Sequence, residues 1–164
     1  MHSRTESSDV PTPVSIEELT ASSSSAVLHQ AHELLLEYGR FVVAQPGAAR
    51  FCFGSLEQEA ARLPHSYIEQ NGGCLIAYVD NQPAGFVAWR TLPATVAPTA
   101  WELKRLWVRP VARGLALGRA LTQAAIDRAI AAGQTALYLD LGFEPCPPYN
   151  DNPVEGLAWL RKSL

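Results

Sequence analysis

Hydrophobic residues in the first third of the chain recur at the spacing of an amphipathic helix. In the segment 26–44, one helical face collects the apolar positions Val27, Leu34, Leu35, Tyr38 and Val42. The spacing predicts a helix that has a serine of the 22–25 cluster as its N-cap and ends before residue 45. A shorter helix is expected at 55–63, where Ser55 and Gln58 have capping-box spacing.

The middle of the chain changes to short apolar runs that are typical of β-strands. The runs 74–79 (CLIAYV) and 84–89 (AGFVAW) flank a turn-forming DNQP segment, which predicts an antiparallel hairpin. A further strand is expected at 101–108, where residue types alternate. The alternation predicts one face with Trp101, Leu103, Arg105 and Trp107, and an opposite face with Glu102, Lys104, Leu106 and Val108.

The last third of the chain predicts one long helix and several short strands. An alanine-rich helix is expected at 115–132, with Gly133 as its C-terminal stop, and a buried strand at 136–139. Further strand candidates lie at 141–144 and 156–160. Residues 1–14 are polar and show no periodicity, so we expect a flexible tail there and a single domain over 15–164.

Composition and charge narrow the class of protein. The 164 residues are 48% hydrophobic and carry a formal net charge of −3, which argues for an ordinary globular domain and against a nucleic-acid binder. No apolar run approaches the ~18 residues of a membrane span, so no membrane association is expected. The start of the chain lacks an apolar signal segment, and the cysteines are few and scattered, so we expect a reduced, cytoplasmic setting and no metal site.

The segment RGLALGR (113–119) carries the clearest chemical signal. Small residues let the backbone approach a ligand closely, and the start of a helix leaves several N–H groups without intrahelical partners. Such a helix start favours an anion, typically a phosphate. The alternative is that the glycines only form a turn between a strand and a helix.

In its wider context this segment resembles the acetyl-CoA-binding motif of the GNAT superfamily of N-acetyltransferases. The stretch ELKRLWVRPVARGLALGRAL matches the motif at Val108, Pro110, Arg113, Gly114, Ala116 and Gly118. The hairpin before it and the segments LYLD and LGFEP after it also resemble GNAT segments, so the resemblance spans about residues 26–162. It implies an α/β (α+β) fold with a mixed, largely antiparallel sheet flanked by helices.

The resemblance also implies roles for individual residues. The coenzyme pyrophosphate would be bound by backbone N–H groups of Arg113, Gly114, Leu115, Ala116, Leu117, Gly118 and Arg119. The pantetheine arm would pair with the backbone around Leu106 and Val108, and an N–H near Val108 would hold the oxyanion. Glu102 lies where some relatives keep a general base. The alternative for Glu102 is a surface strand residue paired with Lys104 or Arg105.

One departure from the family bears on both fold and activity. The helix that separates two strands in relatives is absent between Asp140 and Leu141. Because parallel neighbours need a crossover of a dozen or more residues, we expect residues 141–164 to pack atypically, to exchange between subunits, or to belong to a damaged domain. In many relatives that helix carries the tyrosine that protonates the departing thiolate. Tyr149 is the candidate substitute for that tyrosine.

The expected function is acetyl transfer from acetyl-CoA, as co-substrate, to a primary amine by direct attack in a ternary complex. The acceptor would be a small-molecule or peptide amine. The alternative is a degenerate domain that binds acyl-CoA or a protein partner without catalysis. Apolar strands left uncovered by the missing helix favour a homodimer.

Overall fold

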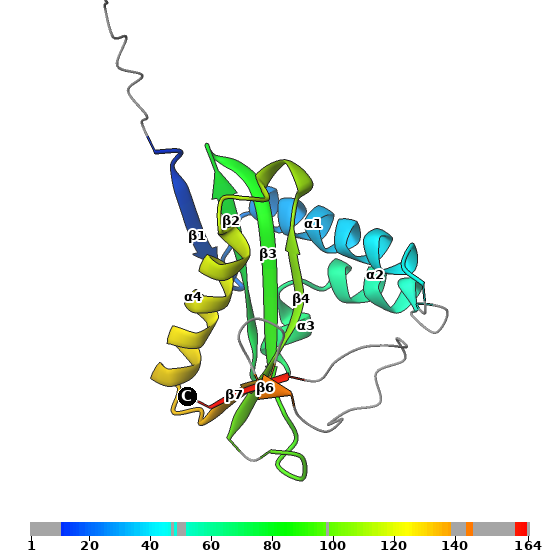
Figure 1. Ribbon diagram of the computed structural model, residues 1–164. Helices are drawn as coiled ribbons and strands as arrows, with labels where there is room; N and C mark the ends of the chain where they lie inside the picture. Colours follow the sequence, from blue (N-terminus) through cyan, green and yellow to red (C-terminus); the bar gives the residue numbers. More distant parts are fainter. Residues whose placement is uncertain are drawn as a thin grey trace, which may run out of the picture.

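A single mixed sheet with helices on both faces organises the protein (Figure 1). The computed structural model describes residues 11–46, 48, 52–97, 99–138, 144–145 and 160–163. In chain order the elements are β1 (Val14–Glu18), α1 (Ser25–Val43), α2 (Phe53–Ala61), α3 (His65–Ile68), β2 (Gly73–Val79), β3 (Gln82–Thr91), β4 (Ala100–Val108), the 3₁₀ turn η2 (Pro110–Ala112), α4 (Leu117–Ala131), β5 (Ala136–Tyr138), β6 (Glu144–Pro145) and β7 (Leu160–Ser163).

The sheet has the strand order β1-β2-β3-β4-β5-β7-β6. Strands β4 and β5 pair in parallel, and the other neighbouring strands pair antiparallel. The predicted mixed, largely antiparallel sheet flanked by helices is therefore confirmed. The predicted hairpin is confirmed as well, with Asp80 and Asn81 both at positive φ between β2 and β3, as a tight two-residue turn requires.

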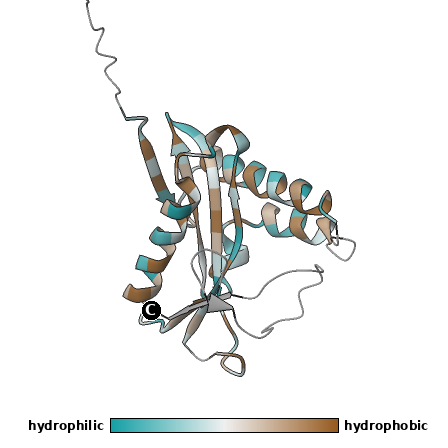
Figure 2. Cartoon of the chain, in the orientation of Figure 1, coloured by the Kyte–Doolittle hydropathy of each residue, from teal (hydrophilic) through white to brown (hydrophobic). Residues whose placement is uncertain are grey.

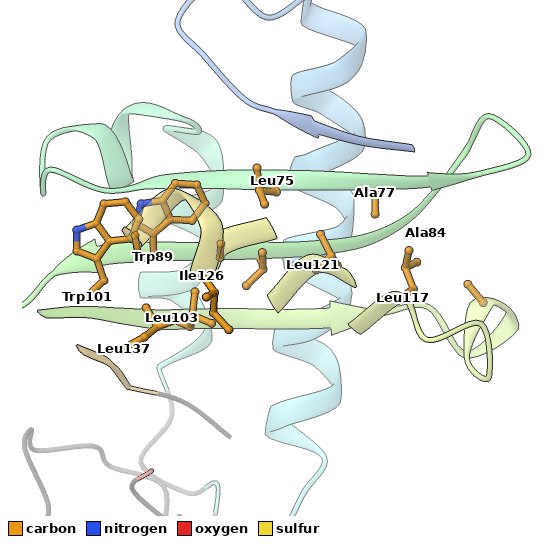
Figure 3. Close-up of a cluster of buried hydrophobic side chains, with 14 residues drawn as sticks. Leu75, Ala77, Ala84, Trp89, Trp101, Leu103, Leu117, Leu121, Ile126 and Leu137 are labelled. Atoms are coloured by element: carbon orange, nitrogen blue, oxygen red, sulfur yellow. The ribbon is translucent and has the colours of Figure 1, made fainter. Parts of the chain in front are cut away.

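The alternation of side chains along the strands builds two hydrophobic cores, one on each face of the sheet. Leu75, Val87 and Leu103 pack with α4 on one face, and Trp89 stacks on Trp101 at one end of this cluster (Figure 3). The other core joins Ile76 and Phe86 of the sheet to α1, α2 and α3. Figure 2 shows hydrophobic residues along the central strands and mixed colouring on the helices, as a sheet covered on both faces requires.

A β-bulge in β4 interrupts the predicted alternation. Phe86 lies opposite Trp107 and Ala88 opposite Lys104, so two residues of β4 face one residue of β3. Arg105 sits in the bulge with a φ of +62°. The prediction that Trp101, Leu103, Arg105 and Trp107 share one face is therefore wrong. Trp101 and Leu103 belong to the α4 core, whereas Trp107, beyond the bulge, belongs to the α1 core.

The helix starts are only partly predictable from the sequence. Ser24 caps α1 by accepting a hydrogen bond from the Val27 N–H, as the serine cluster indicates. The capping box at Ser55 is wrong, because α2 begins earlier and Cys52 is its N-cap. The Cys52 Sγ accepts from the backbone N–H of Ser55 at 3.4 Å.

The N-terminal boundary also needs a correction. The sequence pattern places Val14 in the tail, but Val14 is the first residue of β1 and lies opposite Val79. The Pro13 carbonyl accepts a hydrogen bond from the Asp80 N–H at 3.0 Å. The strand β1 itself is not predicted, since VSIEE offers little hydrophobic alternation. Residues 1–10 lie outside the described part of the chain.

The two C-terminal strands β6 and β7 extend the sheet beyond β5. Tyr138, at the end of β5, and Glu144, at the start of β6, both lie opposite Arg161 of β7. Strand β6 thus starts at the level where β5 ends and runs in the same direction. Because β7 lies between β5 and β6, the two strands are not parallel neighbours, and the long crossover that such neighbours need is not required here. Of the two last predicted strands, 141–144 and 156–160, only Glu144 and Leu160 are described, and both lie in strands.

Candidate functional site: the open edge of β4

Among the described residues, strand β4 is paired on both sides over its first part. Its parallel pairing with β5 joins Ala100 to Ala136 and Glu102 to Tyr138, the last described residue of β5. On the β3 side the pairing continues to Val108. From Leu103 to Val108, no strand in the described part of the chain pairs with the β5-facing edge of β4. This edge can accept an extended ligand as an additional strand would be accepted.

The backbone groups on this edge belong to Leu106 and Val108. The Arg109 N–H donates to the Ala84 carbonyl on β3 at 2.8 Å. Because backbone groups of successive strand residues point to opposite edges, Trp107 also faces β3, whereas Leu106 and Val108 face the open edge. The geometry is therefore compatible with the predicted pairing of Leu106 and Val108 with a pantetheine arm.

The open edge leads directly into a helix start that has no side-chain cap. After the η2 turn, Gly114 has a φ of +87° and Ala116, the N-cap of α4, a φ of +55°. Neither Ala116 nor any other side chain of the described residues accepts a hydrogen bond at this cap, so the first N–H groups of α4 are available to an anion. A Cβ added at Gly114 would meet nothing within 4 Å, so the turn is open on that side.

Packing beneath the turn fixes its position. Leu117, the first residue of α4, is only 2% exposed and belongs to the α4 core. A Cβ on Gly85 of β3 would lie 3.3 Å from Leu117 and 2.9 Å from Leu121, so the glycine allows α4 to approach the sheet closely. The predicted phosphate-binding residues therefore differ in their exposure to solvent. Leu117 anchors the helix by its side chain, and Arg113, Gly114, Leu115, Ala116 and Arg119 are exposed.

Glu102 lies opposite Tyr138, the last described residue of β5, beside the part of β4 that no described strand covers on this side. It is only 4% exposed, and its carboxylate accepts a hydrogen bond from Arg90 Nε at 2.6 Å. The alternative prediction of a surface residue is wrong, because the Glu102 side chain is buried and the β3–β4 register places Arg90 directly opposite it. Lys104 is half-buried, and burial, followed by the charges of Arg105 and Arg90, lowers its pKa.

A partly buried ion pair holds the bulge in place. Glu59 of α2 accepts hydrogen bonds from Arg105 Nε at 3.1 Å and Nη2 at 3.0 Å, and from the Tyr67 hydroxyl. Burial alone would raise the pKa of Glu59, but the Arg105 guanidinium lowers it below its usual 4.5. Burial and the Glu59 charge raise the pKa of Tyr67 well above its usual 10. Arg105 also lies 5.7 Å from the centre of the Tyr38 ring.

A second acidic residue, Glu37 of α1, binds the end of β4. It accepts hydrogen bonds from Trp107 Nε1 at 3.2 Å and from Arg109 Nη2 at 2.7 Å. Sequence reasoning missed Glu37 and Glu59 because their partners lie 72 and 46 residues away in the chain. A signal was present nonetheless: both acidic residues lie one helical turn from apolar core positions, where an unpaired charge would be costly.

Three predictions remain to be compared with the structure: those for Tyr149, for a metal site and for a membrane span. Tyr149 lies outside the described residues. Among the described residues, His29, His32 and Glu33 place their ligand atoms within 4.8 Å of one another, and His29 is exposed. No helix among the described residues is long and apolar enough to cross a bilayer.

Comparison with known proteins agrees with this geometry. The family model of the acetyltransferase (GNAT) family matches residues 29–144. An uncharacterised N-acetyltransferase of Schizosaccharomyces pombe is 29% identical over 127 residues, which are 68% of this chain and 76% of that protein.

Solved structures share the fold at low sequence identity. The PaiA N-acetyltransferase of Thermoplasma acidophilum, in complex with coenzyme A, gives a TM-score of 0.67 at 15% identity and covers 93% of this chain and 99% of that chain. A GNAT family acetyltransferase of Brucella melitensis, in complex with acetyl-CoA, gives a TM-score of 0.58 at 17% identity over 80% and 79% of the two chains. Since the family model spans well over half of the 164 residues, the chain belongs to the acetyltransferase (GNAT) family.

Proposed function

We propose that the protein transfers an acetyl group from acetyl-CoA to a primary amine. The observation that carries the proposal is the continuity of two features. The unpaired backbone edge at Leu106 and Val108 runs into the uncapped start of α4, where Gly114 leaves the turn open. An extended arm ending in a pyrophosphate fits both features at once. The coenzyme A and acetyl-CoA bound by the two structural neighbours support this assignment.

Each group in this site has a distinct task in the proposed reaction. Acetyl-CoA supplies an activated thioester. The N–H groups of Leu117, Gly118 and Arg119 hold the pyrophosphate, and those of Leu106 and Val108 align the arm. The Val108 N–H is our candidate for the donor to the acetyl oxygen as negative charge develops there.

Glu102 is our candidate for the group that takes the proton from the attacking ammonium, directly or through water. It lies opposite Tyr138, the last described residue of β5, and next to Leu103, where no described strand covers this edge of β4. Its Oε2 accepts the hydrogen bond from Arg90. The amine nitrogen then forms a bond to the acetyl carbon, the carbon–sulfur bond of the thioester breaks to release the thiolate, and the nitrogen loses its second proton to give the amide. Tyr149 is the proposed source of the proton that this thiolate takes up.

One observation favours the alternative, a domain that binds acyl-CoA without turnover. The Glu102 carboxylate is buried and already held by an arginine, an arrangement that also serves a purely structural role. In that case the coenzyme would bind at the same edge, but no amine would be acetylated.

Acetylation of an amine panel separates these possibilities. Purified protein is incubated with acetyl-CoA and polyamines, amino acids, an aminoglycoside or peptide N-termini, and free coenzyme A and acetylated product are quantified by mass spectrometry. We expect product from at least one amine class, above the hydrolysis seen without amine. Tight coenzyme binding without product from any amine would instead support the binding domain.

A further inference from the structure

Residues of helix α1 contact the end of β4 and the first residue after it. Glu37 faces this point and accepts hydrogen bonds from two residues near the strand end, Trp107 and Arg109. Burial would raise the pKa of Glu37, but these donors and the charge of Arg109 lower it, so the carboxylate is ionised at neutral pH.

Arg109 connects this carboxylate to the sheet. Its side chain donates through Nη1 to the Pro83 carbonyl at 2.8 Å, and its backbone N–H donates to the Ala84 carbonyl at 2.8 Å. The residue is thus fixed from α1 and from the start of β3 at the same time. Because Arg109 follows Val108 directly, its position determines where the open backbone edge of β4 ends.

One turn further along α1, Phe41 continues the contact. Its ring lies 5.3 Å from the ring of Trp107, and the Arg113 guanidinium lies over both rings, 5.2 Å from Trp107 and 6.0 Å from Phe41. Arg113 Nε also donates to the Val108 carbonyl at 3.3 Å. Both ends of the 109–113 turn are therefore tied to α1, through Glu37 at one end and Phe41 at the other.

We propose that Glu37 is a positioning residue for coenzyme binding: through Arg109 and Trp107 it fixes the open edge of β4 and the turn into α4 in the geometry that receives acetyl-CoA. Glu37 does not touch the coenzyme. It acts on the alignment of the Leu106 and Val108 backbone with the start of α4. The inference rests on the proposed function, because it assigns a role to Glu37 only if acetyl-CoA binds at this edge.

The test compares Glu37→Gln with Glu33→Gln by calorimetric titration with coenzyme A. Glutamine keeps an acceptor for Trp107 but loses the charge that holds Arg109. Loss of one charge-assisted hydrogen bond predicts an increase in Kd of about tenfold for Glu37→Gln. Glu33 lies on the same helix and is paired only with its neighbour His32 in the described structure, so Glu33→Gln is expected to leave Kd unchanged.

Further readouts separate positioning from general support of the fold. Thermal unfolding identifies a temperature at which both variants are fully folded, and the titrations are carried out there. With an accepted amine, Glu37→Gln should raise the KM for acetyl-CoA and leave the KM for the amine unchanged. A Kd equal to that of the wild type, with only the melting temperature lowered, would overturn the positioning role. Absence of coenzyme binding by the folded wild type would overturn both this role and the proposed function.

Discussion

The two halves of β4 have the same neighbour on one edge and different surroundings on the other. From Ala100 to Glu102 the strand is paired with β3 and with β5, and its side chains complete the α4 core and the Arg90 ion pair. From Leu103 to Val108 it keeps β3 but has no partner from the described strands on its other edge. The first half of the strand thus completes the sheet, and the second half is the part that we propose to bind the coenzyme.

The bulge at Arg105 lies within the second half and changes the direction of the side chains that follow it. It turns Trp107 toward α1, where Glu37 and Phe41 hold it. Leu106 and Val108 then lie on the α4 side, where they pack against the core while their backbones face the open edge. One irregular residue, held by Glu59, therefore determines which surface of the second half is available to a ligand.

The largest expected effect comes from a charge at the end of the open half. Gly114→Glu places a carboxylate beside the proposed pyrophosphate site. Two unit charges about 4 Å apart at a protein surface repel by about 4 kcal/mol, which corresponds to about a thousandfold increase in the Kd for coenzyme A. The measurement is a calorimetric titration.

Gly133→Glu is a matched control for this variant. Gly133 also has a positive φ, +75°, with nothing within 4 Å of an added Cβ, but it lies at the other end of α4. Both variants carry similar backbone strain. Equal weakening of binding by both would show that strain, rather than charge at the phosphate site, is responsible.

The second-largest effect is expected at Glu102, where the first half of β4 ends. Glu102→Gln removes the proposed base and is expected to lower kcat by about a hundredfold, in the range that a positioned base contributes. Arg90→Gln breaks the same ion pair but leaves the carboxylate, so it should lose stability while retaining more of kcat. Steady-state kinetics with an accepted amine measure both. Equal losses of kcat in the two variants would reduce Glu102 to a structural role.

The smallest effect is expected at Glu59, the residue that binds Arg105 in the bulge. Glu59→Gln is expected to lower the free energy of unfolding by about 2 kcal/mol, because Arg105 and Tyr67 lose their charged acceptor. The Glu59 pKa is depressed in the folded state, so its contribution is present above 4.5 and is lost as pH falls through the depressed value. The difference between wild type and variant should therefore shrink in acid.

Denaturant unfolding between neutral pH and about pH 3, below the ordinary range of a glutamate, measures this difference. Glu69→Gln is the control, because the Glu69–Arg62 pair has both side chains more than half exposed and should contribute little. A difference between wild type and Glu59→Gln that stays constant as pH falls would contradict the assignment.

Sequence reasoning succeeded where local patterns decide the structure. The hairpin followed from two apolar runs around a polar turn, and the α1 N-cap followed from the serine cluster before the helix. It failed at the bulge, because positive φ is signalled by glycine and the position holds Arg105.

The partners of the charged residues could not be predicted for a different reason. Arg90 meets Glu102 only through the β3–β4 register, and Glu37 meets Arg109 only through the packing of α1 on the sheet. Neither ion pair produces a periodic pattern in the sequence from which it could be predicted. The position of β7 between β5 and β6 could not be predicted either, because it is set by antiparallel pairing of a short strand far along the chain.

Residue-resolved amide hydrogen exchange, with and without saturating acetyl-CoA, tests the central claim about β4 most directly. The Leu106 and Val108 amides face the open edge, whereas the Trp107 amide faces β3. We predict that acetyl-CoA slows exchange at Leu106, at Val108 and in the 114–119 segment, and leaves Trp107 unchanged. Unchanged exchange at Leu106 and Val108 while the coenzyme is bound would contradict the account.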